Sequence, residues 1–142
     1  MTETTVNVLD LGSENMDNIP DLEPAPDGSE VEIRLISHMT GFTKDDQLPY
    51  LSPVFELPDY PNAPDFNKFL WLPCDKLREI KGEKKYNQAR RSMADFMEAF
   101  GITGPRFDMT EYYGSTAYAI VGIEESDEYG RKNRIKKFVL SA

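Results

Sequence analysis

The sequence predicts a mainly β fold of five strands, with one helix between the third and fourth strands. Apolar and polar residues alternate in five short segments, which is the pattern of half-buried strands. One longer segment between them repeats its apolar residues every three or four positions, which is the pattern of a helix packed on one face. The chain has 142 residues, 39% hydrophobic and 29% charged, and is therefore long enough to enclose one core.

Residues 1–29 are predicted to form an acidic, flexible leader before a folded domain at residues 30–142. Residues 18–30 hold three prolines and a glycine among acids, a composition that does not pack a core. Of the 25 acids in the chain, eight lie in residues 1–30, which contain no Lys or Arg, so 17 acids and 16 bases remain in residues 31–142. The formal charge of −9 belongs mostly to the leader and does not exclude a polyanionic ligand for the domain.

Three strands are expected before the helix. Val31–His38 alternates apolar and polar residues, and Met39–Pro49 is interpreted as a loop. Tyr50–Pro58 is the second strand, in which Pro53 predicts an edge position or a bulge. After a turn rich in Pro, Asp and Asn, a short third strand is predicted at residues 67–73.

The helix is predicted from one apolar stripe that ends before Gly101, a residue typical of helix ends. Residues 75–80 are expected to add a separate turn, broken at Gly82. The stripe consists of Tyr86, Ala89, Met93, Phe96, Met97 and Phe100.

The last two strands, at residues 116–126 and 134–140, are close enough in sequence to form a hairpin. A two-residue turn at Tyr129–Gly130 would fix their register, although a bulge would change it. That register predicts three opposite-charge pairs, Glu128 with Arg131, Asp127 with Lys132 and Glu125 with Arg134. It leaves Lys136 and Lys137 opposite Ile123 and Gly122, with no acid facing either lysine.

Three strands, a helix and two strands, in this order, predict a five-stranded OB-fold barrel. This partly open Greek-key barrel binds oligonucleotides over its second and third strands and over the loops 1–2 and 4–5.

Catalytic and cofactor motifs are missing from the sequence. His38 and Cys74 are the only residues of their types and lie 36 positions apart in apolar settings, where structural roles are favoured over a catalytic pair. The sequence contains no phosphate-binding glycine loop and no metal-ligand spacing. We therefore expect no enzyme activity, cofactor or metal, and no membrane span or disulfide; a single cysteine suits a reducing cytoplasm.

Aromatic residues beside bases form the best functional signal, because single strands are held by stacking on aromatic faces and by a positive groove. The alternative for the strand aromatics is core packing, and the alternative for the basic stretch Lys84–Arg91 is a solvated helix face. The candidate nucleic-acid-binding residues are Phe42, Lys44, Tyr50, Lys68, Phe69, Trp71, Tyr129, Arg131, Lys132, Arg134, Lys136 and Lys137.

Residues 28–140 resemble the OB-fold single-stranded DNA-binding proteins of bacteriophages. The resemblance rests on "PDGSEVEIRL", "YLSPVFELP", the helix end from Phe96 to Ile102 and, above all, the closing "EESDEYGRKNRIKKFV". It implies sequence-independent binding of single-stranded DNA in phage replication or recombination, in the cytoplasm of a bacterial host. Such proteins often recruit replication proteins through an acidic C-terminal tail, whereas here the acidic segment that could do so is N-terminal. The alternative function is an OB-like protein–protein adaptor in a phage replication complex.

Overall fold

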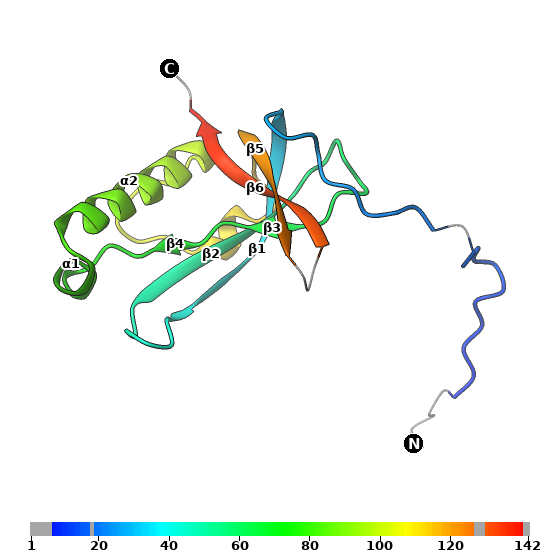
Figure 1. The fold of residues 1–142 in the computed structure, drawn as a ribbon, viewed down its shortest axis with the longest axis horizontal. Coiled ribbons are helices and arrows are strands. Elements are labelled where there is room, and N and C mark those ends of the chain that lie inside the picture. Colours follow the sequence, from blue (N-terminus) through cyan, green and yellow to red (C-terminus); the bar gives the residue numbers. More distant parts are fainter. Residues whose placement is uncertain (1–6, 18, 127–129, 141–142) are drawn as a thin grey trace.

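The protein is mainly β, with one six-stranded antiparallel sheet and two α-helices among the residues that the structure describes (Figure 1). This structure is a computed structural model, and it describes residues 7–17, 19–126 and 130–140. The strands are β1 (Glu30–Phe42), β2 (Pro49–Glu56), β3 (Phe66–Asn67), β4 (Leu70–Trp71), β5 (Thr116–Ser126) and β6 (Gly130–Val139). The helices are α1 (Asp75–Lys81), α2 (Glu83–Phe100) and the 3-10 helix η1 (Met109–Tyr112).

The strand order is β3-β2-β1-β5-β6, with β4 also paired to β2, and the hydrogen-bonded sheet is not closed into a barrel. The prediction of a mainly β fold is confirmed. The prediction of five strands is wrong, because the third strand is divided into β3 and β4. The separate turn predicted at residues 75–80 is the helix α1, which ends before Gly82 as expected. None of the described helices is long and apolar enough to cross a membrane.

Pro53 explains the division of the third strand. The strand β2 lies between β1 and the β3/β4 pair, so the prediction of an edge position for Pro53 is wrong. The carbonyl oxygen of Pro53 accepts from the Lys68 amide at 3.2 Å, between the pairs Leu51–Leu70 and Val54–Asn67. Proline has no amide hydrogen to return to residue 68. The ladder is therefore interrupted opposite Pro53.

The first hairpin is longer than predicted. The strand β1 continues to Phe42, which pairs with Pro49, so the loop shrinks to residues 43–48. Two contacts attach this loop to α1: Lys81 forms an ion pair with Asp46 at 3.2 Å, and Lys76 donates to the Gln47 carbonyl at 3.3 Å.

The helix α2 follows the predicted stripe, with Ala89, Met93, Phe96 and Phe100 buried. It ends at Gly101, whose φ of 69° is the left-handed conformation that glycine adopts at low cost. Phe96 and Phe100 pack with Phe55 of β2 and Phe138 of β6, so α2 covers the inner face of the sheet.

The register of the β5–β6 hairpin differs from the predicted one by three residues. Ser126 pairs with Gly130, and three residues lie between the strands, where a two-residue turn was expected. Glu125 therefore faces Arg131 and Glu124 faces Lys132, at 3.6 Å in both ion pairs. The predicted partners Asp127 and Glu128 lie outside the described residues, and the predicted pair Glu125–Arg134 is wrong.

A bulge further along the hairpin changes the surroundings of the two lysines. Val121 pairs with Ile135 and Ile120 pairs with Lys137, so Lys136 is an extra residue in β6. The prediction that Lys136 has no acidic partner is wrong, because its ammonium lies 3.2 Å from the Asp27 carboxylate.

Asp27 belongs to a stretch of the predicted leader that contacts the sheet. Ala25 is 0% exposed within the main hydrophobic core. Gly28 donates its amide to the Val121 carbonyl at 2.8 Å, which extends the ladder between β1 and β5. Residues 7–17 lie away from the sheet (Figure 1).

Candidate nucleic-acid interface

Three of the predicted aromatic residues meet on the outer face of the sheet. The Tyr50 and Phe69 rings are stacked, with centroids 5.0 Å apart and planes inclined by 29°. The Trp71 ring meets Phe69 edge-on at 4.8 Å. Phe69 is 46% exposed and the other two are half-buried. We call these three residues the aromatic cluster.

The strand pairing explains why these rings lie together. Tyr50 of β2 is paired with Trp71 of β4, and side chains directly opposite each other in a ladder share a face. Tyr50 also lies over Gly41 of β1, where a Cβ atom would come within 3.0 Å of the tyrosine hydroxyl. A larger residue at position 41 would therefore displace Tyr50.

Met39 is a neighbour of the cluster that the sequence analysis did not single out. It pairs with Ser52 on the next strand and is 53% exposed, although it lies within a strand. The predicted first strand ends at His38, so Met39 is expected in a loop. Its two-residue spacing from Gly41 is the signal that could have placed both residues on one face of a longer strand.

A row of bases follows the outer face of β6. It contains Lys132, Arg134, Lys136 and Lys137, and we call it the basic row. Lys132 and Lys136 have acidic partners in Glu124 and Asp27. No described carboxylate lies within 4.0 Å of the charged group of Arg134 or Lys137.

The side chains of Arg134 and Lys136 pass close to the backbone of Gly122 on β5. A Cβ atom at this position would lie 2.8 Å from Lys136 Cε and 3.2 Å from Arg134 Nε. Asp27 Oδ1 would be 3.3 Å away, so the carboxylate shares the same small area with the two cations.

A hollow of about 550 Å³ lies between β3 and β6. Asn67 of β3 lines it on one side and Arg131 and Lys132 of β6 on the other; the remaining lining residues are Leu22, Pro64, Asp65 and Gly130. We call it the β3–β6 hollow.

Asn67 joins this hollow to the aromatic cluster. Its amide nitrogen donates to Ser52 Oγ at 2.5 Å, and Ser52 is buried beside Met39 in the β1–β2 ladder. The pKa of the Asp65 carboxyl, at the hollow, is raised first by partial burial and then by the charge of Glu56.

The remaining candidates do not join this surface. Lys68 is half-buried, and its pKa is lowered by desolvation, with the nearby Asp95 carboxylate opposing that shift. Phe42 alternates with Gly41 along β1 and so leaves the opposite face from Tyr50. Lys44 is exposed in the first hairpin loop. Tyr129 lies outside the described residues.

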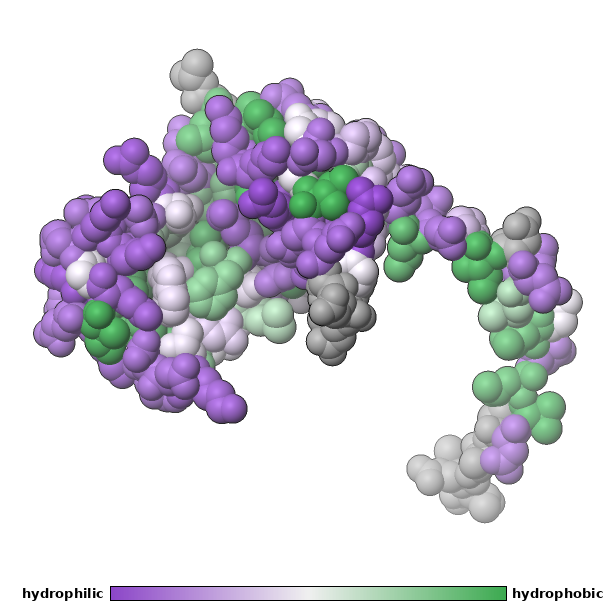
Figure 2. Space-filling model, viewed as in Figure 1, coloured by the Kyte–Doolittle hydropathy of each residue, from purple (hydrophilic) through white to green (hydrophobic). Residues whose placement is uncertain are grey.

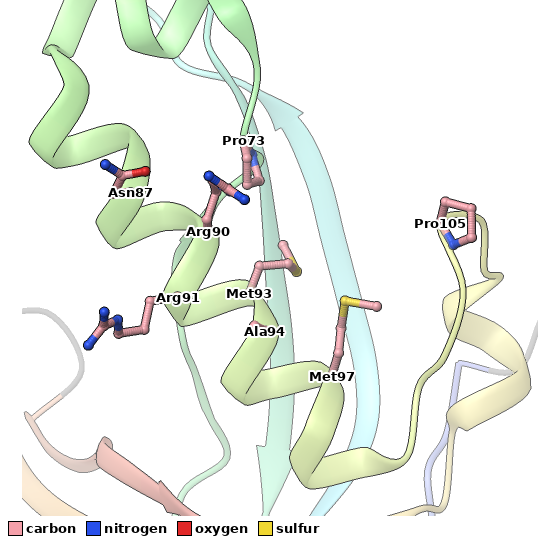
Figure 3. Close-up of a pocket in the computed structure, with 8 residues that line it drawn as sticks. All are labelled: Pro73, Asn87, Arg90, Arg91, Met93, Ala94, Met97 and Pro105. Carbon is pink, nitrogen blue, oxygen red and sulfur yellow. The ribbon is translucent and has the colours of Figure 1, made fainter.

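A larger hollow, about 1120 Å³, lies along α2 and is open to solvent (Figure 3). Its lining consists of Pro73, Asn87, Arg90, Arg91, Met93, Ala94, Met97 and Pro105. No residue of this lining is a nucleophile or can exchange a proton near neutral pH.

His38 and Cys74, the only residues of their types, have separate structural contacts. The His38 Nδ1 atom shares a hydrogen bond of 2.5 Å with the Tyr113 hydroxyl. Cys74 precedes α1 and packs against Leu48 and Leu77. Within the described ranges, no three His, Cys, Asp or Glu side chains are grouped closely enough to hold a metal ion.

A scan against protein-family models and a search of curated proteins both found no match to this chain.

Proposed function

We propose that the protein is a non-enzymatic, sequence-independent single-stranded DNA-binding protein. The observation that carries this proposal is the aromatic cluster, because the exposed Phe69 ring stands on the same sheet whose strand β6 carries the basic row. A base has an aromatic face in any sequence, so stacking on Phe69 would not depend on sequence. The basic row would take the phosphates.

We also propose that the sheet is a partly open OB barrel. Its edge strands β3 and β6 contact each other without forming a hydrogen-bonded ladder. The helix α2 precedes β5 and packs over the inner face. In an OB fold, the second and third strands carry the oligonucleotide. These correspond to β2 and the divided β3/β4 strand, which supply the cluster.

The proposal is tested by titrating a labelled single-stranded oligonucleotide with the full chain at several salt concentrations. If two to four cations of the basic row contact phosphates, log K should fall against log salt with a slope of about −1.4 to −2.8. A duplex of the same sequence should bind more weakly, because its bases are not available to stack on Phe69. The proposal fails if no single-strand binding is seen at low salt.

An adaptor remains the competing function, since exposed aromatic residues are also enriched in protein interfaces. The same titration separates the two functions, because an adaptor would retain no oligonucleotide even at low salt. The role in phage replication or recombination rests on the sequence resemblance of residues 28–140 alone.

A further inference from the structure

The leader is attached to the sheet by hydrogen bonds between Ala25 and Asn133, and we call this contact the anchor. The Ala25 amide donates to Asn133 Oδ1 at 2.9 Å, and Asn133 Nδ2 donates back to the Ala25 carbonyl at 3.0 Å. Asn133 is 0% exposed and also donates to the Gly122 carbonyl at 3.0 Å. Two reciprocal bonds to a buried amide hold this point of the leader firmly against β5 and β6.

The residues just before the anchor lie over the β3–β6 hollow. Leu22 lines the hollow itself, and Asp21, Leu22 and Glu23 line an adjoining recess together with Arg131. The Glu23 amide donates to the Asn62 carbonyl at 3.0 Å. The anchor therefore delivers two carboxylates to the end of β6 that faces β3.

This part of the leader is held much less firmly than the anchor. Leu22 is 72% exposed, and Asp21 and Glu23 are also exposed. Further apolar side chains stay exposed along the leader and form the green groups on the extended segment in Figure 2: Val8, Leu9, Leu11, Met16 and Ile19. Arg131 already faces Glu125 at 3.6 Å, so a further exposed carboxylate near Arg131 adds only a small binding free energy.

We propose that Asp21–Glu23 and single-stranded DNA occupy the β3–β6 hollow in alternation. This inference rests on the proposed function, because the hollow is lined both by Lys132 of the basic row and by Asn67, two residues before Phe69, so a strand that contacts the row and the cluster would pass it. Arg131 lines the recess beside the segment when the segment is in place, and it contacts a phosphate when DNA is bound. The anchor stays in place in both states.

The anchor raises the effective concentration of Asp21–Glu23 at the β3–β6 hollow, because it tethers the segment next to it. A tethered segment has an effective concentration on the order of millimolar at the site it can reach. If the segment binds the hollow with a local dissociation constant of about 1 mM and its effective concentration there is about 2–4 mM, it weakens DNA binding by about threefold to fivefold at low salt. Screening removes this effect as the Debye length falls to about 3 Å at 1 M salt.

The test compares two variants of the full chain that lose the same charge. Asp21→Asn with Glu23→Gln removes the two carboxylates beside Arg131. Asp10→Asn with Glu14→Gln removes the same two residue types from the distant part of the leader. All four side chains are exposed, so both variants should unfold at the wild-type temperature.

At low salt, the first variant should bind a single-stranded oligonucleotide about threefold to fivefold more tightly than wild type. The second should bind as wild type does, and the difference should vanish at high salt. Equal tightening in both variants would mean that overall charge acts, and no tightening would mean that the segment does not compete; either result overturns the inference. If wild type and both variants all fail to bind, the proposed function fails as well.

Discussion

Removing the Phe69 ring tests the aromatic cluster most directly. In Phe69→Ala, the residue at the exposed end of the stack is lost, while the core aromatics Phe55 and Phe96 are left in place. One ring face of Phe69 is already covered by Tyr50, with centroids 5.0 Å apart, so one face remains for a base.

The expected loss follows from this geometry. Stacking of a base on an aromatic side chain is worth about 1–3 kcal/mol, and a half-covered ring belongs in the lower part of that range. A loss of about 1–2 kcal/mol corresponds to binding that is about 5-fold to 30-fold weaker. Stability should change less, because Phe69 is 46% exposed and loses two ring contacts, so we expect a melting temperature lower by about 3–5 °C.

The assay is fluorescence anisotropy of a labelled single-stranded oligonucleotide at fixed salt, with circular dichroism to check folding. Tyr118→Ala is the matched control, because Tyr118 is 52% exposed on β5 but is not part of the aromatic cluster. Two results would refute the reasoning: unchanged affinity in folded Phe69→Ala, or an equal loss in Tyr118→Ala.

Three further experiments test the basic row, Trp71 and the anchor. Lys137→Glu should weaken single-strand binding about tenfold at low salt and flatten the salt slope, whereas Lys84→Glu, the same change on α2, should do neither; equal effects would exclude a specific role for β6. A saturating oligonucleotide should alter the emission of Trp71, the only tryptophan, and constant emission would remove this residue from the interface. Asn133→Ala should lower the free energy of unfolding by roughly 2–4 kcal/mol, because both backbone groups of Ala25 would stay buried without their partner; a urea midpoint equal to that of wild type would contradict the role of the anchor.

Features that depend on neighbouring residues could be predicted from the sequence. The predicted bounds of β5, residues 116–126, are those of the structure, and Gly82 and Gly101 end their helices as expected. Alternation along a strand and the left-handed preference of glycine are both local effects, so the chain encodes them without reference to the rest of the fold.

Features that depend on contacts between distant segments could not be predicted. The register of the last hairpin is set by the three residues that the strands leave between them, which alternation alone does not determine. The contact between Ala25 and Asn133 joins residues 108 positions apart. The composition of residues 18–30 predicts a linker, but no local pattern indicates that the buried Asn133 binds it.

The aromatic cluster shows how a local rule and a long-range contact combine. Pro53 lacks an amide hydrogen, and the ladder opposite it is interrupted at Lys68 and Phe69. The interruption divides one strand into β3 and β4, so Phe69 lies between the two paired segments and remains 46% exposed. The segments β3 and β4 pair with β2 in the same register, so a residue with an amide donor at position 53 would allow them to join. In the proposed function, the sheet lacks one hydrogen bond opposite Pro53, and the exposed Phe69 ring in this interruption is accessible to a base.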